Sequence, residues 1–214
     1  MDYKILINFA TRNRPDKALA CLDNIQQMCE GDCTILLKID NSDTNDYSFA
    51  SKFKNVHILK GDSTGKIDAI NRGGLLNLKW DILLNHSDDM WFIRPFDGQI
   101  KSDMATYFPD LDGCLHYPDG YANQLWTYSI IGRKYYERDK YIYHPDYVSL
   151  WCDNEAQEVA QIRGKFQTIP HQLFEHRHPA WGRTHYDTQY LEQGAYYRHD
   201  EQTYLRRKNR NFDL

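Results

Sequence analysis

The stretch WDILLNHSDDMWF, residues 80–92, places two adjacent carboxylates directly after an apolar run. Residues 81–84 predict a short buried strand, and Asp88 and Asp89 follow it almost at once. Two like charges at the end of a buried strand are costly unless a partner neutralises them. The identity of that partner is the first question that the sequence raises.

Strands and helices alternate through the first half of the chain. The apolar patterns predict strands over residues 4–10, 34–39, 56–59 and 81–84, a helix that opens at Pro15 and a second helix over 64–78. Such alternation implies right-handed crossovers and a parallel sheet. The expected fold class is therefore α/β, with ligands at the carboxyl ends of the strands.

Polar residues gather at those strand ends. They fall in residues 10–14, 40–43, 61–66 and 86–89, and parallel strands bring all four tips to one edge of the sheet. A single polar tip is an ordinary loop, whereas four acid- or amide-bearing tips together indicate a binding site. The first strand is not followed by a glycine-rich phosphate fingerprint, so neither a dinucleotide fold nor a P-loop is supported.

Composition limits the class of protein. The 214 residues fit one domain, 1–214, and 26 Lys plus Arg against 30 Asp plus Glu give a net charge of 26 − 30 = −4. That balance does not indicate a nucleic-acid binder, although the tail carries a local cluster of basic residues over 206–210. The start of the chain does not read as a signal peptide, and the sequence predicts neither a membrane span nor disulfides; we expect a cytoplasmic protein.

The order of four short motifs resembles the GT-A-type glycosyltransferases, particularly their family 2-like members. These motifs are ATRNRP (10–15), IDNSD (39–43), GKIDAINRGG (65–74) and NHSDDM (85–90). The resemblance implies a Rossmann-like, mostly parallel sheet flanked by helices. It also implies a nucleotide-sugar-binding half over 1–92, and an acceptor-binding and catalytic half over 93–214 whose C-terminal extension binds acceptor and metal.

The resemblance assigns donor-binding residues. Thr11 and Asp40 correspond to the positions that hold the nucleotide base, and Lys66, Asp68 and Asn71 to the helix that lines the nucleotide pocket. Further donor-binding candidates at the same strand ends are Arg12, Arg14 and Ser87.

The acidic D-x-D metal motif of the family aligns with His86, Ser87 and Asp88. Its first acid is replaced by His86, which leaves Asp88 as the surer ligand. Mg²⁺ or Mn²⁺ would bridge to the diphosphate, and Mn²⁺ also accepts imidazole. The alternative is structural: Asp88 and Asp89 would then start a helix, with aromatic residues packing behind them.

The second half supplies the candidate base. Residues 129–132 predict a strand, and a helix follows that starts near Asp153 and ends at Gly164. The motif CDNE resembles the acidic motif that places a general base just before this helix, which makes Asp153 the candidate and Glu155 the reserve. A helix N-cap is the alternative role for Asp153.

Two late histidines, His176 and His178, alternate and would share one face of an extended segment. The motif HRHP resembles the late histidine that completes metal coordination in GT-A enzymes, and His178 is preferred over His176. The alternative is structural, since a lone histidine is more often an ordinary core or surface residue. A separate zinc site from His171, His176, His178 and His185 is a further alternative, without a nearby cysteine to support it.

The leading hypothesis is a metal-dependent glycosyltransferase that moves a sugar from a nucleotide-sugar donor, a UDP-sugar first, to an acceptor hydroxyl. A single base at Asp153 favours inversion of the anomeric centre. The acceptor could be a saccharide or a hydroxymethylated DNA base. The alternatives are a nucleotidyltransferase, which would normally show a glycine-rich loop after the first strand, and a catalytically degenerate nucleotide-sugar-binding module.

Overall fold

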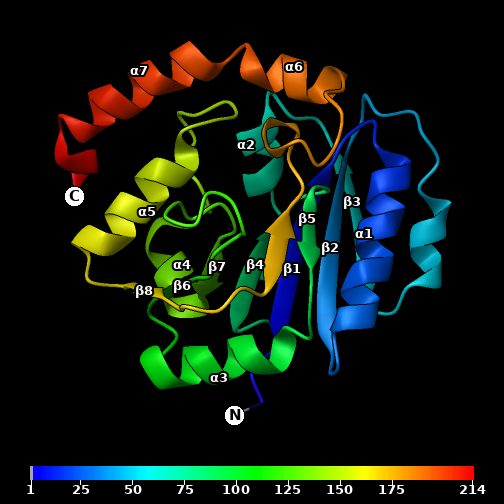
Figure 1. The fold of residues 1–214 in the computed structure, drawn as a ribbon, viewed down its shortest axis with the longest axis horizontal. Helices are drawn as coiled ribbons and strands as arrows, with labels where there is room; N and C mark the ends of the chain where they lie inside the picture. Colours follow the sequence, from blue (N-terminus) through cyan, green and yellow to red (C-terminus); the bar gives the residue numbers. More distant parts are fainter. Residues whose placement is uncertain (1) are drawn as a thin grey trace.

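The main sheet has the strand order β3-β2-β1-β4-β7-β6-β8 in the computed structural model, which describes residues 2–214 (Figure 1). Its strands are β1 (Ile5–Thr11), β2 (Cys33–Asp40), β3 (Val56–Gly61), β4 (Ile82–His86), β6 (Cys114–His116), β7 (Ile130–Gly132) and β8 (Phe166–Thr168). The first four run parallel, whereas β7 pairs antiparallel with both β4 and β6. The predicted α/β class with a mostly parallel sheet is confirmed.

Helices cover both faces of this sheet. They are α1 (Pro15–Met28), α2 (Lys66–Asn71), α3 (Asp97–Tyr107), α4 (Arg133–Asp139), α5 (Cys152–Ile162), α6 (Thr188–Gly194) and α7 (Tyr197–Lys208), with short 3-10 turns η1 (Ser48–Lys52), η2 (Leu75–Asn77), η3 (Pro179–Trp181) and η4 (Asn211–Asp213). One apolar core joins the sheet to α1 and α3, and a second joins it to α2, α4, α5 and α7. Among residues 2–214, none of the helices is long and apolar enough to cross a membrane.

Alternation along the strands decides which side chains meet which core. In β1, Ile7 and Phe9 belong to the core shared with α1, whereas Leu6 and Ala10 face the core shared with α2. Strand side chains point to opposite faces at successive positions, so this parity continues to the strand ends. It places Lys38 and Asp40 of β2 on the face that carries the cavity described below, and His86 of β4 on the opposite face.

The helix expected over 64–78 is shorter than predicted. α2 ends at Asn71, and Gly74 then adopts a left-handed conformation with φ of 96° before the turn η2. Glycine takes this conformation at little steric cost, and the Gly73-Gly74 pair therefore breaks the helix that the apolar pattern alone suggested.

A second, two-stranded sheet brings the late histidines beside the acid pair. β5 (Met90–Phe92) pairs antiparallel with β9 (Phe174–His176), and Met90 stands opposite His176. Beyond it, α6 and α7 lie across the end of the molecule toward which β1 runs, opposite the N-terminus (Figure 1).

Candidate functional site

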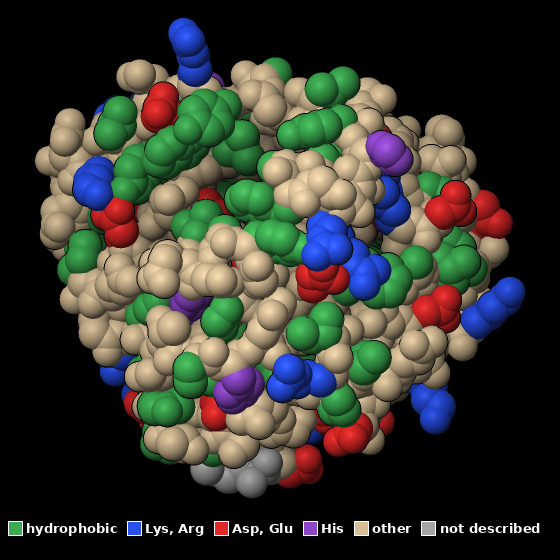
Figure 2. Space-filling model, in the orientation of Figure 1, with side chains coloured by type: hydrophobic (Ala, Val, Ile, Leu, Met, Phe, Trp, Pro, Cys, Tyr) green, Lys and Arg blue, Asp and Glu red, His purple; other side chains and the backbone are tan. Residues whose placement is uncertain are grey.

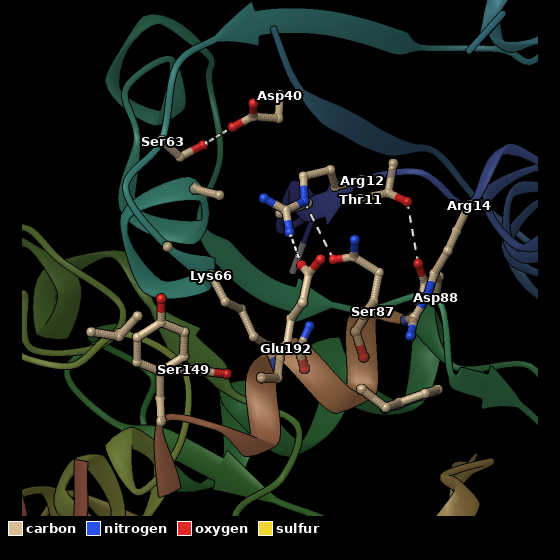
Figure 3. Close-up of a pocket in the computed structure, with 18 of the residues that line it drawn as sticks. Thr11, Arg12, Arg14, Asp40, Ser63, Lys66, Ser87, Asp88, Ser149 and Glu192 are labelled. Carbon is tan, nitrogen blue, oxygen red and sulfur yellow. Dashed lines mark hydrogen bonds and ion pairs between the residues drawn. The ribbon is translucent and has the colours of Figure 1, made fainter. Parts of the chain in front are cut away.

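A cavity of about 420 Å³ lies at the carboxyl ends of β1, β2 and β4, and α2 and α6 complete its wall (Figure 3). This volume lies in the range of roughly 300–1,000 Å³ that is typical of small-molecule sites. Its polar lining comprises Thr11, Arg12, Arg14, Lys38, Asp40, Ser63, Thr64, Lys66, Ser87, Asp88, Asp89, Ser149, Gln189, Tyr190, Glu192, Gln193 and Tyr196. The predicted edge of the sheet therefore carries a cavity of suitable size for a ligand.

Asp40, the last residue of β2, forms one end of the cavity. Its Oδ1 accepts hydrogen bonds from the backbone nitrogen (2.9 Å) and the hydroxyl (2.6 Å) of Ser42, and its Oδ2 accepts one from the hydroxyl of Ser63. Burial opposes the charged form, but these bonds and the charge of Arg12 outweigh it and lower the pKa of Asp40 to about 2. The carboxylate is ionised at neutral pH, and it keeps acceptor capacity for a further N–H.

Arg14 neutralises Asp88, the first of the two adjacent acids. Its Nη1 lies 2.7 Å from Oδ1 of Asp88, and the hydroxyl of Thr11 donates to Oδ2 at 3.2 Å. The side chains of the ion pair are only 9% and 6% exposed. Burial raises the pKa of Asp88, and Arg14 offsets part of that effect. In this structure the partner of Asp88 is thus a side chain from the β1–α1 loop.

His176 neutralises the second acid, Asp89. Its Nε2 lies 3.4 Å from Oδ2 of Asp89, and its Nδ1 lies 3.4 Å from Oδ2 of Asp119. Burial disfavours the imidazolium, but the two carboxylates outweigh it and raise the pKa of His176 to about 9. The hydroxyls of Ser87 (2.5 Å) and Tyr190 (3.1 Å) also donate to Asp89. Both acids of the opening stretch are therefore paired with cationic side chains.

Comparison with known proteins relates this geometry to a fold. No model of a protein family matches the sequence, and no curated protein matches it significantly. Solved structures do match. A mannosyltransferase from Pyrobaculum calidifontis, solved with GDP-mannose and Mn²⁺, superposes with a TM-score of 0.62 at 13% identity, over 84% of this chain and 59% of that one.

Two further structures agree. TarS of S. aureus, in complex with UDP-GlcNAc, gives a TM-score of 0.62 at 12% identity over 81% of this chain and 58% of its own. A Drosophila β-1,4-galactosyltransferase 7, solved with manganese, UDP-galactose and xylobiose, gives 0.50 at 13% identity over 88% and 79%. The fold is of the GT-A type. This chain spans about three fifths of the length of the first two proteins.

Most of the predicted donor-binding residues line the cavity of this GT-A fold. Those that do are Thr11, Arg12, Arg14, Asp40, Lys66 and Ser87. Asp68 lies outside the lining, where its carboxylate accepts the backbone nitrogen of Thr64 at 2.8 Å. Asn71 also lies outside, and its amide donates to the carbonyl of Tyr143 at 2.6 Å. Both hold loops next to the cavity rather than facing it.

His86, aligned with the first position of the D-x-D motif, faces away from the cavity. It is the last residue of β4, and the alternation of side chains along the strand directs its ring into the core shared with α1. There the ring packs against Phe9, Phe92 and Tyr128. Its Nδ1 lies 2.9 Å from the Tyr128 hydroxyl, and burial lowers its pKa to about 3. This placement gives His86 a structural environment, because a neutral imidazole in an aromatic core does not reach a ligand in the cavity.

The side chains at Asp88 and Asp89 are of the chemical types that bind a divalent cation. Carboxylate oxygens suit Mg²⁺ and Mn²⁺, and imidazole suits Mn²⁺. Asp88 and Asp89 line the cavity and would hold the ion. His178, whose ring lies 5.3 Å from that of His176, accepts a hydrogen bond at Nδ1 from Ala180. Within residues 2–214 no three acidic, histidine or cysteine side chains are already grouped as a ligand set.

Asp153 lies inside the first turn of α5 rather than at its cap. The helix begins at Cys152, and the cap position is Trp151, which has a left-handed φ of 61°. The Asp153 carboxylate accepts only the neighbouring backbone nitrogen of Asn154, at 3.0 Å. Burial raises the pKa of Asp153, and the positive charge of Lys66 offsets part of the effect. The N-cap role considered from the sequence is therefore wrong, and the carboxyl group is largely uncommitted.

Glu155, the reserve base, is fully engaged in a structural contact. Nε of Arg207 donates to both of its carboxylate oxygens, at 3.0 and 2.8 Å, and the hydroxyl of Tyr147 donates at 2.7 Å. All three side chains are buried or nearly so. This cluster fastens α7 to α5, and its carboxylate is not exposed to the cavity.

Sequence reasoning missed two groups of cavity residues. One is Lys38 on β2, which the alternation with Asp40 would have placed on the same face. The other belongs to α6, whose Glu192 pairs with Arg12 (Figure 3). Just before α6 and outside the lining, Asp187 lies 2.6 Å from Arg14. The sequence around α6 has no motif that marks it as part of the site.

Proposed function

We propose that this protein is a metal-dependent glycosyltransferase that moves a sugar from a nucleotide-sugar donor, a UDP-sugar first, to an acceptor hydroxyl. The observation that carries the proposal is that Asp40 and the pair Asp88-Asp89 line one cavity at the carboxyl edge of a GT-A sheet. A nucleotide diphosphate has an N–H-bearing base at one end and an anionic diphosphate at the other. The two kinds of carboxylate match these two ends, the second through a cation.

Cationic side chains support the diphosphate part of this proposal. Arg12, Arg14 and Lys66 line the same cavity. Arginine presents several N–H donors in a geometry that suits phosphate oxygens, and lysine adds a point charge. A divalent cation, when bound, supplies stabilisation of the negative charge that develops on the leaving diphosphate. The side chains alone would orient the donor and balance much of its charge.

Asp153 supports the acceptor half of the reaction. Its carboxyl group has a raised pKa and a single local hydrogen bond, so it is free to take a proton. A base that removes the proton of the acceptor hydroxyl lets that oxygen attack the anomeric carbon directly. In-line displacement with one base inverts the anomeric configuration, and we propose inversion for this chain.

A saccharide is the acceptor that we propose. Xylobiose is named in the solved structure of the galactosyltransferase, whereas a DNA acceptor has no support from the structures compared. On the face drawn in Figure 2, basic and acidic side chains are interspersed rather than gathered into a broad basic surface. A DNA-binding face normally needs such a surface to contact phosphates.

A nucleotide-binding panel tests the proposal. Calorimetry with UDP, GDP, CDP and ADP, each with and without Mn²⁺, should show binding that Mn²⁺ strengthens. In Asp88→Asn the gain from Mn²⁺ should disappear while metal-free binding persists. The melting temperature should fall, because Asp88 forms a buried ion pair with Arg14. Asp110→Asn, which changes an acid far from the cavity, is the matched control. Equal gain from Mn²⁺ in wild type and Asp88→Asn would exclude Asp88 as a ligand.

Activity assays on the wild-type protein distinguish the alternative functions. Incubation with a UDP-sugar should release UDP slowly by hydrolysis and faster with an acceptor saccharide. A degenerate binding module would bind UDP and release none from its sugar. A nucleotidyltransferase would instead consume a nucleoside triphosphate and a sugar phosphate with release of pyrophosphate.

A further inference from the structure

Lys38 is a buried lysine in the wall of the cavity. It lies on β2, two residues before Asp40, and strand alternation puts both side chains on the cavity face of the sheet. The residue is only 1% exposed, although it lines the cavity. Lysine is almost never fully buried unless it is paired, so this position requires an explanation.

The protein provides little to balance the charge of Lys38. Its Nζ donates one hydrogen bond, to the carbonyl of Ile70 at 2.7 Å, and that carbonyl also accepts from the amide of Asn8 at 3.1 Å. Within the described part of the chain no carboxylate forms an ion pair with Lys38, and the charged neighbour is Arg72. Burial and the like charge of Arg72 lower the pKa of Lys38 to about 7. An amine with spare N–H donors thus lines the cavity.

The two terminal nitrogens of Arg72, near this end of the cavity, are committed to the protein, although its buried Nε has no partner among the described residues. Nη2 of Arg72 donates to the carbonyl of Ile39 at 3.0 Å, and its Nη1 donates to the carbonyl of Gly61 and to the Ser63 hydroxyl. Ser63 in turn donates to Asp40. This chain fixes the orientation of the Asp40 carboxylate. Arg72 does not line the cavity, whereas Lys38 lines it on the same face as Asp40 and has N–H groups left for a ligand.

We propose that Lys38 selects the nucleobase of the donor by donating to a ring carbonyl next to the N–H that Asp40 accepts. This inference rests on the proposed function, since it assumes that the cavity holds a nucleotide. Uracil presents a carbonyl beside N3–H, and guanine presents one beside N1–H. Cytosine and adenine present the reverse pattern, an acceptor nitrogen beside an amino group. A base held in one orientation thus matches the pair formed by Lys38 and Asp40 if it is uracil or guanine, whereas cytosine or adenine in that orientation would place an acceptor nitrogen against the Asp40 carboxylate.

Calorimetry on the wild type and on Lys38→Met tests the assignment. The wild type should bind UDP and GDP at least about tenfold more tightly than CDP and ADP, because a mismatched base leaves buried polar groups unpaired. Lys38→Met should lose roughly tenfold in affinity for UDP and much less for CDP, so that the preference shrinks. Lys60→Met, on the exposed surface of β3, is the matched control and should keep the wild-type preference.

Thio-substituted ligands test the same contact without relying on one variant. Sulfur is a poor hydrogen-bond acceptor, so either 4-thio-UDP or 2-thio-UDP should bind the wild type several-fold more weakly than UDP. In Lys38→Met that loss should vanish. UDP binding with an unchanged base preference in Lys38→Met, or equal binding of both thio analogues and UDP to the wild type, would overturn the role of Lys38 and leave the proposed function standing. A wild type that binds none of the four nucleotides would overturn both.

Discussion

The floor of the cavity, formed by the ends of β1, β2 and β4, and its roof, formed by α6, are held by different kinds of contact. In the floor, the parallel ladder pairs Thr11 with Ile39 and Asp40 with Gly61, so backbone bonds fix the positions of the polar tips. The loop after β1 is fixed by a side chain of the neighbouring loop, because the carboxylate of Asp43 accepts the backbone nitrogen of Asn13 at 2.6 Å. The floor is therefore rigid before any ligand binds.

The roof is attached mainly through side chains. Glu192 pairs with Arg12, and these side chains are 49% and 40% exposed. Asp187 pairs with Arg14 at 2.6 Å and with Lys17 at 3.0 Å. The Arg12–Glu192 pair is exposed, and exposed ion pairs contribute only about 0.2–1 kcal/mol each. The second attachment is firmer, because Arg14 is only 9% exposed and the Tyr190 hydroxyl of α6 donates to Asp89 at 3.1 Å. The roof is therefore held firmly near Asp187 and Tyr190 and only weakly at Glu192, whereas the floor is fixed throughout.

The chain after the roof is fixed again. Asp200 of α7 is fully buried and accepts the backbone nitrogens of Val148 (3.1 Å), Ser149 (2.8 Å) and Leu150 (2.7 Å). α6 therefore lies between two anchored regions, the sheet and α7. We infer that the floor recognises the ligand and that the roof moves when the ligand binds.

The largest effect that we expect comes from Asp153 on α5, which belongs to neither the floor nor the roof and lies outside the cavity lining. Asp153→Asn should lower turnover by at least about 10²-fold, because an amide cannot accept the proton and general-base catalysis contributes ~10²–10⁴-fold. Donor affinity and melting temperature should change little. The raised pKa gives a further expectation. The deprotonated form is active, so kcat of the wild type should fall as pH drops through a value above the ordinary aspartate pKa.

Glu155→Gln is the matched control for Asp153, two residues away on the same helix. It removes the buried one of the carboxylates that pair with Arg207 and leaves Asp213, which is 50% exposed; breaking a buried pair costs several kcal/mol. The melting temperature should therefore fall clearly, while the remaining folded protein keeps its turnover. Near-normal turnover in Asp153→Asn would remove that residue from the reaction.

The next largest effect tests the floor. Asp40→Ala should weaken UDP binding by roughly 10-fold or more, since a hydrogen bond to a charged group contributes about 1.5–3 kcal/mol. The loss should be the same with and without Mn²⁺, which separates Asp40 from the acid pair. Asp46→Ala, in the same loop but outside the cavity lining, should bind UDP like the wild type. Calorimetry on both variants decides whether Asp40 recognises the base or only closes the turn after β2.

The floor could be predicted from the sequence because its determinants are local. Apolar runs marked β1, β2 and β4, and polar residues directly after them gave Thr11, Asp40 and Asp88 as cavity residues. The exception was His86, where the family alignment competed with strand parity and parity prevailed. Likewise the helix predicted over 64–78 ends at Asn71, shortly before the left-handed Gly74.

The roof could not be predicted because its contacts join distant parts of the chain. Arg12 and Glu192 are 180 positions apart in the sequence, and nothing near either residue indicates the other. The partner of Asp88 was missed for a related reason. Arg14 was expected to contact the donor, and its role as counter-ion emerges only when the loop after β1 folds over the end of β4. Electrostatic pairing across a fold leaves no periodic pattern in a sequence.

The smallest effect that we expect tests the roof. Glu192 forms an ion pair with Arg12, and the proposed function assigns Arg12 to the donor diphosphate. The donor must therefore displace the Glu192 carboxylate before it binds. Glu192→Gln keeps the shape of the side chain and removes its charge. UDP should then bind up to about fivefold more tightly, the equivalent of the 0.2–1 kcal/mol of an exposed ion pair. Glu30→Gln, an exposed acid away from the cavity, controls for the change in net charge.

Salt dependence sharpens this last measurement. Exposed ion pairs are screened as ionic strength rises, so the advantage of Glu192→Gln over the wild type should shrink between low and high salt. Calorimetry of UDP binding at two salt concentrations measures both quantities in one experiment. Weaker binding in Glu192→Gln at low salt would reverse the interpretation. Glu192 would then be a residue that contacts the donor, and the roof would belong with the floor as part of the recognition surface.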